Sequence, residues 1–245
     1  MTVTRYTLPA PLSRPVTVAL ATDLHGRDGD GVVREIGREG ADLIAVAGDV
    51  AGKSDQGRNG PLSNSVSFLR NCSAIAPTFL SLGNHEADLS PAELDALLGS
   101  GATVLDNSFV RTGELTVGGL TSGYFNERPG RRLRETPAPD ADFVRRLSRE
   151  KGFRVLLCHH PEYYPGLLRD AGIDLILSGH AHGGQWRLFG RGLFAPGQGI
   201  LPRYTSGVHD GRLVISRGLA NTLFPVPRLF NPTELVFVRL EPDGS

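Results

Sequence analysis

The sequence predicts an α/β fold in which two mixed β-sheets pack face to face with helices outside, a four-layer α/β/β/α sandwich. Two observations lead to this class. Short β-branched or aliphatic runs alternate with segments of helical spacing in the first part of the chain, as in βαβ units. The last part instead carries strand-like segments separated by Gly- and Pro-containing loops, which indicates a second sheet.

The expected strands follow from these apolar runs. The runs that alternate with helical segments are 16–21, 43–47, 78–82, 153–158 and 173–177. Segment 103–120 also alternates in a way that suits short strands, and Gly113 marks a turn within it. The later expected strands are 186–188, 212–216 and 234–240.

Four helices are expected between the strands. Val32, Val33 and Ile36 give the first an apolar face, and the second covers 63–71. The third begins at Ser90-Pro91-Ala92-Glu93, which supplies an N-cap, a proline at the first helical position and an acid placed for a capping box. The fourth covers 140–149, with Phe143 and Leu147 on one face.

Length and composition predict one globular domain, residues 1–245. The 26 Lys and Arg residues balance the 26 Asp and Glu residues, which argues against a broad nucleic-acid or anionic-membrane surface but leaves room for a local basic patch. The longest apolar run, 43–47, is far shorter than a membrane-spanning helix. Without a recognisable signal peptide, we expect a cytoplasmic protein whose Cys72 and Cys158 are reduced.

Histidines and acids gather directly after the expected strands. Six of the seven histidines lie in four clusters, and a Gly-Asp pair follows a further strand in the same way. The five motifs are Asp23-Leu24-His25, Gly48-Asp49, Gly83-Asn84-His85-Glu86, Cys158-His159-His160-Pro161 and Gly179-His180-Ala181-His182. Strand ends of this kind are where open α/β folds place ligands, so we expect the five motifs to converge on one sheet edge.

The donor types predict a metal centre. Carboxylate, imidazole and amide oxygen without thiolate suit Mn, Fe, Zn or Co. The expected ligands are Asp23, His25, Asp49, Asn84, His159, His180 and His182. Seven are too many for one tetrahedral ion, whereas two ions sharing a carboxylate fit. Residues two apart in extended backbone point to the same side, so each Asp-x-His or His-x-His pair is expected to hold one ion.

Two other histidines receive a different interpretation. His160 would point away from His159 in an extended segment, and we expect it either to support a ligand from behind or to face solvent. His209 lies in a polar loop, where we expect no functional role.

On these five motifs, the sequence resembles the calcineurin-like metallophosphoesterase superfamily. The segment Ser178-Gly179-His180-Ala181-His182-Gly183-Gly184-Gln185, followed by Ser216-Arg217-Gly218-Leu219, is similar to one bacterial branch, with the pattern GHxHGGQ. Members of that branch include phosphodiesterases associated with the cell wall or directed at lipid headgroups.

The resemblance also implies roles for the individual residues. Metal one would be held by Asp23, His25, Asp49 and His182, and metal two by Asp49, Asn84, His159 and His180. Asp49 would bridge the two ions, and a hydroxide between them would attack phosphorus in line. His85 matches the histidine that contacts the phosphate and protonates the leaving oxygen. Glu86 could orient a neighbouring histidine.

The predicted function is hydrolysis of a phosphodiester bond in a small organic phosphate. A phosphomonoesterase or a nucleotide-linked pyrophosphatase is the alternative among enzymes, and a degenerate metal-binding scaffold is the alternative outside them. Such scaffolds usually lose ligands, whereas this ligand set is complete.

The loop 122–140 is the other candidate for substrate contact. It carries Arg128, Arg131, Arg132 and Arg134 among glycines and prolines. These arginines either form a solvated surface or belong to a lid that binds a second phosphate or an anionic leaving group, because guanidinium groups pair well with phosphate oxygens. The expected substrate-binding residues are Asn84, His85, Arg128 and Arg131.

Overall fold

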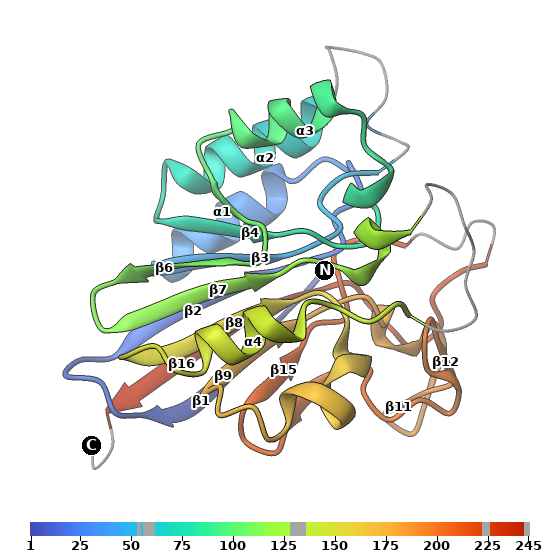
Figure 1. The fold of residues 1–245 in the computed structure, drawn as a ribbon. Helices are drawn as coiled ribbons and strands as arrows, with labels where there is room; N and C mark the ends of the chain where they lie inside the picture. The colour runs from blue at the N-terminus through green and yellow to red at the C-terminus, as the bar shows by residue number, and fades with distance from the viewer. Residues whose placement is uncertain (53–54, 56–61, 128–135, 222–225, 243–245) are drawn as a thin grey trace.

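Two six-stranded mixed sheets form the body of the molecule in the computed structural model, which describes residues 1–52, 55, 62–127, 136–221 and 226–242 (Figure 1). In spatial order, the first sheet contains β1 (Thr2–Ala10), β16 (Glu234–Pro242), β2 (Val16–Ala21), β3 (Leu43–Ala47), β4 (Thr78–Ser81) and β5 (Thr103–Leu105). The second contains β14 (Gly207–His209), β15 (Leu213–Ile215), β9 (Leu175–Ser178), β8 (Phe153–Cys158), β7 (Leu115–Leu120) and β6 (Ser108–Thr112).

Helices cover the outer face of each sheet. The helices are α1 (Asp30–Glu39), α2 (Ser63–Ser73), α3 (Pro91–Leu98) and α4 (Ala141–Leu147). The first three pack on the first sheet through one apolar cluster, and α4 packs on the second sheet through another. Figure 1 shows this order of helix, sheet, sheet and helix. The predicted four-layer sandwich is therefore confirmed.

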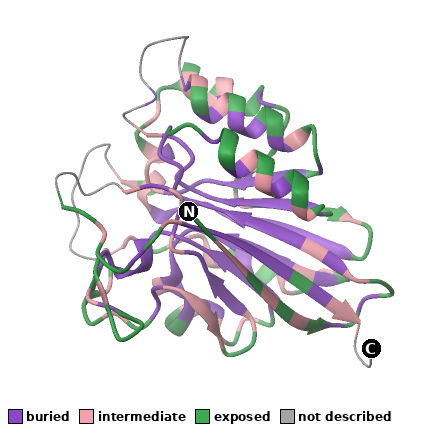
Figure 2. Ribbon diagram, turned by 180° about the vertical axis from the view of Figure 1, so that it is seen from behind, coloured by how far each residue is buried: buried purple, intermediate pink, exposed green. Residues whose placement is uncertain are grey.

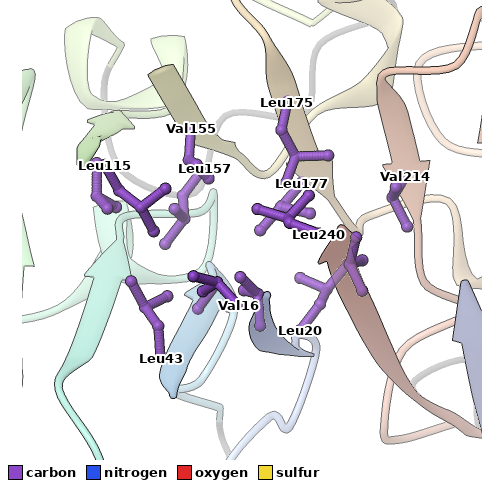
Figure 3. Close-up of a cluster of buried hydrophobic side chains, with 14 of the residues drawn as sticks. Val16, Leu20, Leu43, Leu115, Val155, Leu157, Leu175, Leu177, Val214 and Leu240 are labelled. Atoms are coloured by element: carbon purple, nitrogen blue, oxygen red, sulfur yellow. The ribbon is translucent and has the colours of Figure 1, made fainter. Parts of the chain in front are cut away.

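The central core lies between the two sheets. Leu20 and Leu43 of the first sheet meet Leu157 and Leu177 of the second within one cluster of buried side chains (Figure 3). All five residues of β3 are buried, because its other face is covered by helices. The packed sheets hold the ends of their strands in fixed positions relative to one another.

Two of the predicted helix starts are seen in detail. Ser90 accepts a hydrogen bond from the backbone of Glu93, and the Glu93 carboxylate accepts one from the backbone of Ser90 at 2.8 Å. Asp140 caps α4 by accepting from the backbone N–H of Phe143 at 2.9 Å. Both caps satisfy amides that have no partner inside the helix.

The sheet assignment differs from the sequence prediction in three places. Strand β1 was not anticipated, because this edge strand mixes exposed and partly buried residues and lacks a continuous apolar run. Strand β16 lies between β1 and β2 in the first sheet rather than in the second. Segment 186–188 contributes only the two-residue β10 (Arg187–Leu188), which pairs with β11 (Arg191–Gly192) outside both sheets. Long-range pairing decided the first two cases, whereas β10 and β11 form a local hairpin.

Within the described ranges, none of the helices combines the length and apolar character that a membrane crossing requires.

Candidate metal centre

The five predicted motifs meet at one end of the packed sheets, where strands of both sheets finish. Motifs 23–25, 48–49 and 83–86 follow β2, β3 and β4 of the first sheet. Motifs 158–161 and 179–182 follow β8 and β9 of the second sheet. The prediction of convergence on one sheet edge was therefore wrong in one respect: the centre lies between the edges of two sheets, because β8 and β9 pair with β7 and β15 instead of with β4.

One group of metal-compatible side chains contains Asp23, His25 and His182. Oδ1 of Asp23 lies 3.7 Å from Nε2 of His25 and 3.4 Å from Nε2 of His182. The rings of His25 and His182 are stacked with their centroids 5.4 Å apart. All three side chains are buried, so they can surround an ion that is screened from bulk water.

A second group contains Asp49, His159 and His180. Oδ2 of Asp49 lies 3.0 Å from Nε2 of His159, and the rings of His159 and His180 are 5.0 Å apart. The two histidines of the His-x-His motif thus belong to different groups. The prediction that this pair holds one ion from extended backbone was wrong, and the split agrees with the division that the resemblance implied.

Asp49, a member of the second group, also lies near a histidine of the first. Besides its contact with His159, its Oδ2 atom lies 3.9 Å from Nε2 of His25 and 4.0 Å from Nε2 of His85. Its Oδ1 atom accepts a hydrogen bond from the backbone N–H of His85 at 2.9 Å. One carboxylate is therefore within reach of both groups.

Left-handed backbone explains why the motifs do not follow the extended geometry expected from their spacing. Asp23, His25 and Asp49 have φ values of 57°, 50° and 52°. His180 and His182 have φ values of 61° and 45°. Non-glycine residues adopt this conformation at a cost, and such strain gathers at functional sites where the surrounding structure enforces it.

The charge states suit cation binding. Burial raises the pKa of the Asp23 and Asp49 carboxyls, but the surrounding imidazoles lower it by more, so both pKa values lie below the usual range. Burial lowers the pKa of His180 to about 3 and that of His182 to about 4. Two ionised carboxylates and the neutral imidazoles of His180 and His182 are thus in the forms that bind metals.

His159 is held in a defined orientation. Its Nδ1 atom lies 2.8 Å from the carbonyl oxygen of Ala47, which can only accept, so Nδ1 is the donor and Nε2 faces Asp49. Burial lowers the pKa of His159, but the Asp49 carboxylate outweighs burial and raises it to about 10. A backbone carbonyl that fixes the tautomer in this way is a common support for a metal-binding histidine.

Buried polar atoms without partners support the same interpretation. Within the described part of the chain, Oδ1 of Asp23 and Oδ1 of Asn84 are buried and accept no hydrogen bond. An unsatisfied buried acceptor is costly, and a carboxylate oxygen more so. Two such oxygens in the motifs that carry the histidines are donors of the predicted N/O type for transition-metal ions.

His85 differs from the other histidines of the centre in its exposure. Its side chain is 39% exposed, whereas the side chain of His25 is 6% exposed. The His85 ring meets the His25 ring edge-on at 4.5 Å. His85 therefore stands at the mouth of the centre, where a substrate could reach it.

Glu86 braces the backbone rather than a histidine. Its carboxylate accepts hydrogen bonds from the backbone N–H groups of Gly83, Asp49 and Ala51 at 2.7, 2.9 and 2.9 Å. The expectation that Glu86 orients a neighbouring histidine was wrong in this respect. It instead ties the loop after β3 to the loop after β4.

His160 is buried, which excludes the solvent-facing alternative. Its Nε2 atom lies 2.7 Å from Oγ of Ser122, and its ring packs against His180 with centroids 4.3 Å apart. It therefore supports the His180 side of the centre from behind, the other alternative that the sequence left open.

Glu162 is a site residue that the sequence analysis missed. Its Oε1 atom lies 3.5 Å from Nε2 of His180 and 3.3 Å from Nδ1 of His160, and it accepts from Oγ1 of Thr136 at 2.5 Å. A carboxylate beside one ring nitrogen leaves the other nitrogen of His180 for a metal. Its position two residues after His160 was the available signal.

Arg228 is the second residue that was missed. Nη2 of its guanidinium group lies 2.9 Å from Nδ1 of His182, and Nη1 donates to the carbonyl oxygen of Arg217 at 2.7 Å. No local pattern marks this arginine, because it follows His182 by 46 positions. Arg128, Arg131, Arg132 and Arg134 lie outside the described residues, and their suggested role stays a prediction.

The Gly179→Ala substitution should disrupt the centre through a steric clash. A β-carbon at position 179 would overlap with Oγ1 of Thr22 and lie 2.5 Å from Oδ2 of Asp23. We expect markedly reduced metal retention, measured by elemental analysis after gel filtration. The control is Gly166→Ala, whose β-carbon meets no atom within 4 Å. Equal metal retention in the two variants would contradict the prediction.

Comparisons with known proteins agree with this geometry. An uncharacterized metallophosphoesterase of Helicobacter pylori is 27% identical over 248 residues, covering 96% of this chain and 62% of the relative. A second one, of Aquifex aeolicus, is 26% identical over 99% of this chain and 93% of the relative. The chain thus spans about three fifths of the Helicobacter protein but nearly all of the Aquifex protein.

A solved structure supports the fold. The Thermus thermophilus sulfate thiohydrolase SoxB, in complex with glycerol, matches with a TM-score of 0.50 and 16% identity over 84% of this chain and 52% of that one. The family model for calcineurin-like phosphoesterases matches residues 16–184, which include all five motifs. The chain therefore belongs to the calcineurin-like phosphoesterase family.

Proposed function

We propose that this metallophosphoesterase is a dinuclear enzyme that hydrolyses phosphodiester bonds. The observation that carries the proposal is the position of Asp49, whose Oδ2 atom lies 3.0 Å from His159 in one group and 3.9 Å from His25 in the other. A pair of ions requires a carboxylate that can reach both of them, and Asp49 lies near histidines of both groups.

The ligands follow from the two groups. Asp23, His25 and His182 would hold metal one, and Asn84, His159 and His180 would hold metal two. Asp49 would belong to both. When bound, the two ions supply Lewis-acid activation of water at neutral pH and compensate the charge that develops on phosphorus-bound oxygens.

His85 is the proposed general acid. It is the accessible histidine beside Asp49, and a positioned imidazole can donate a proton to a leaving oxygen. The neighbouring Asn84 supplies an oxygen with no other partner among the described residues, so the two side chains of this loop divide metal binding and proton transfer.

The preference for a diester rests on the likeness of the segment Gly179-His180-Ala181-His182-Gly183-Gly184-Gln185 to a branch that contains phosphodiesterases. We also propose that the substrate is a small organic phosphate, that the native metals are among Mn, Fe, Zn and Co, and that the protein is cytoplasmic.

The metal requirement leads to the first test. We expect the purified protein to contain about two transition-metal ions per chain and to lose hydrolysis of bis-p-nitrophenyl phosphate when a chelator removes them. Elemental analysis and initial rates measure both quantities. Metal binding should weaken as the pH falls, because His159, whose pKa is about 10, must lose its Nε2 proton to become a ligand.

The same assay separates the alternatives. Faster hydrolysis of p-nitrophenyl phosphate than of the diester would favour a monoesterase. Full occupancy with metal and no hydrolysis of either compound would favour a binding module. Full activity in excess chelator would contradict the dinuclear proposal itself.

His85→Ala should retain the metals and lower kcat by roughly 10² to 10⁴, the usual contribution of a positioned general acid. The matched control is His209→Ala, since His209 contacts the backbone carbonyl of Ser206 at the remote β14. Steady-state kinetics and elemental analysis of both variants check the outcome. Loss of metal from the His85 variant would instead identify it as a ligand.

Glu162→Gln should act through His180. The amide keeps the size of the side chain but removes the charge beside Nε2, and we expect metal affinity to fall by about 10- to 100-fold. Glu35→Gln, on the exposed side of α1, serves as the control. Competition with a chromogenic chelator measures the affinity, and an unchanged value with unchanged pH dependence would remove Glu162 from the centre.

A further inference from the structure

Large apolar side chains project into solvent from two small hairpins and a neighbouring segment, which we name the hairpin surface. The hairpins are β10 with β11, and β12 (Phe194–Ala195) with β13 (Gly199–Ile200). The hairpin surface consists of Trp186, Leu188, Phe189, Phe194, Ile200, Leu201, Leu229 and Phe230. Each is at least 43% exposed, and Phe189 is 96% exposed. Apolar groupings of this extent mark interaction sites.

Hydrogen bonds join these segments into one unit. The backbone N–H of Arg187 donates to the carbonyl of Leu229 at 3.0 Å, and Trp186 Nε1 donates to the carbonyl of Pro227 at 2.9 Å. Leu193 links the two hairpins, because its N–H donates to Trp186 and its carbonyl accepts from Leu201. The unit lies at the end of the molecule that bears β11 and β12 in Figure 1, and Figure 2 shows its loops as largely exposed.

The backbone is unfavourable at three exposed residues that we call the tips: Phe189 in the turn between β10 and β11, Leu201 directly after β13, and Phe230 next to Leu229. Phe189, Leu201 and Phe230 have φ values of 49°, 53° and 53°, in the left-handed region where glycine and asparagine are preferred. They are 96%, 69% and 84% exposed, so no packing within the described chain explains the large side chains. Three bulky apolar residues at strained, exposed tips point to contacts made outside the molecule.

The charged side chains within the hairpin segment itself are all basic. Segment 183–209 contains Arg187, Arg191 and Arg203 and no acidic residue, although the whole chain has equal numbers of basic and acidic residues. Arg191 and Arg203 are exposed. A surface that combines aromatic and aliphatic tips with unopposed arginines is complementary to the interface of an anionic lipid bilayer.

The hairpin surface is also connected to the metal centre. Arg228, next to Leu229, contacts His182, and Asn231, next to Phe230, donates to the carbonyl of His182 at 2.8 Å. The same short segment therefore carries two exposed apolar side chains and supports a member of the centre.

We propose that the hairpin surface docks this protein on anionic phospholipid bilayers, with Phe189, Leu201 and Phe230 inserted among the lipids. A second copy of the chain is a poorer occupant, because a two-fold contact would bring unopposed arginines of both copies together. Phe189, Leu201 and Phe230 are separate exposed side chains, and each can insert between neighbouring lipids. The proposal concerns where the centre works, and it does not depend on the reaction proposed above.

The proposal is tested by measuring vesicle binding of a variant in which the three tip residues are replaced. Phe189→Asn, Leu201→Asn and Phe230→Asn together remove the apolar tips while placing a residue that accepts the left-handed backbone, so the fold should be retained. The control variant combines Ile75→Asn, Leu98→Asn and Val110→Asn, which remove exposed apolar side chains from positions outside the hairpin surface. Circular dichroism and melting temperature confirm folding of both.

We expect the wild type and the control variant to co-sediment with vesicles of phosphatidylcholine and phosphatidylglycerol, and the tip variant to bind at least tenfold more weakly. Binding should weaken with added salt and with vesicles of phosphatidylcholine alone. Equal binding by the tip variant, equal binding to both vesicle types, or no binding by the wild type would overturn the proposal. So would self-association of the wild type that the tip variant lacks, without vesicle binding. Hydrolysis of a soluble diester by the tip variant is a separate readout of the centre.

Discussion

The contact between Asp49 and His159 is the interaction on which the centre depends, because it joins the two sheets at their adjacent edges. Asp49 follows β3 and His159 follows β8, and their side chains meet at 3.0 Å. His159 also reaches the carbonyl of Ala47, at the end of β3. The apolar core behind these residues is shared by both sheets, so its packing sets the spacing of the polar groups in front of it.

Buried carboxylates hold the loops around the centre in place by accepting hydrogen bonds from backbone N–H groups. Glu86 collects amides from the loops after β3 and β4, and Oδ2 of Asp23 accepts from the backbone N–H of His180 at 3.2 Å. These charged hydrogen bonds offset the cost of the left-handed residues that aim the side chains inward. Metal-compatible geometry is therefore a property of the loops held together, rather than of any one motif.

The metal centre buries polar side chains, whereas the hairpin surface, a few residues later in the chain, exposes apolar ones. At His182, burial keeps an imidazole neutral among polar groups, with its pKa lowered to about 4. A few residues later, Phe189 is almost wholly exposed on a strained tip. Arg228 and Asn231 connect the two regions, so an interaction at the surface and the support of His182 share the same segment.

The sequence was sufficient to predict the fold class, most strands of both sheets and the motifs that gather at the candidate metal centre, because apolar periodicity and the chemistry of clustered donors are local properties. The three-dimensional structure was needed to show that β16 joins the first sheet and that His180 and His182 belong to different groups. It was also needed to show that Glu162 and Arg228 contact the histidines. Strand partners and contacts between distant residues arise from packing across the whole chain, and the left-handed turns that redirect the motifs depend on neighbours that spacing does not reveal.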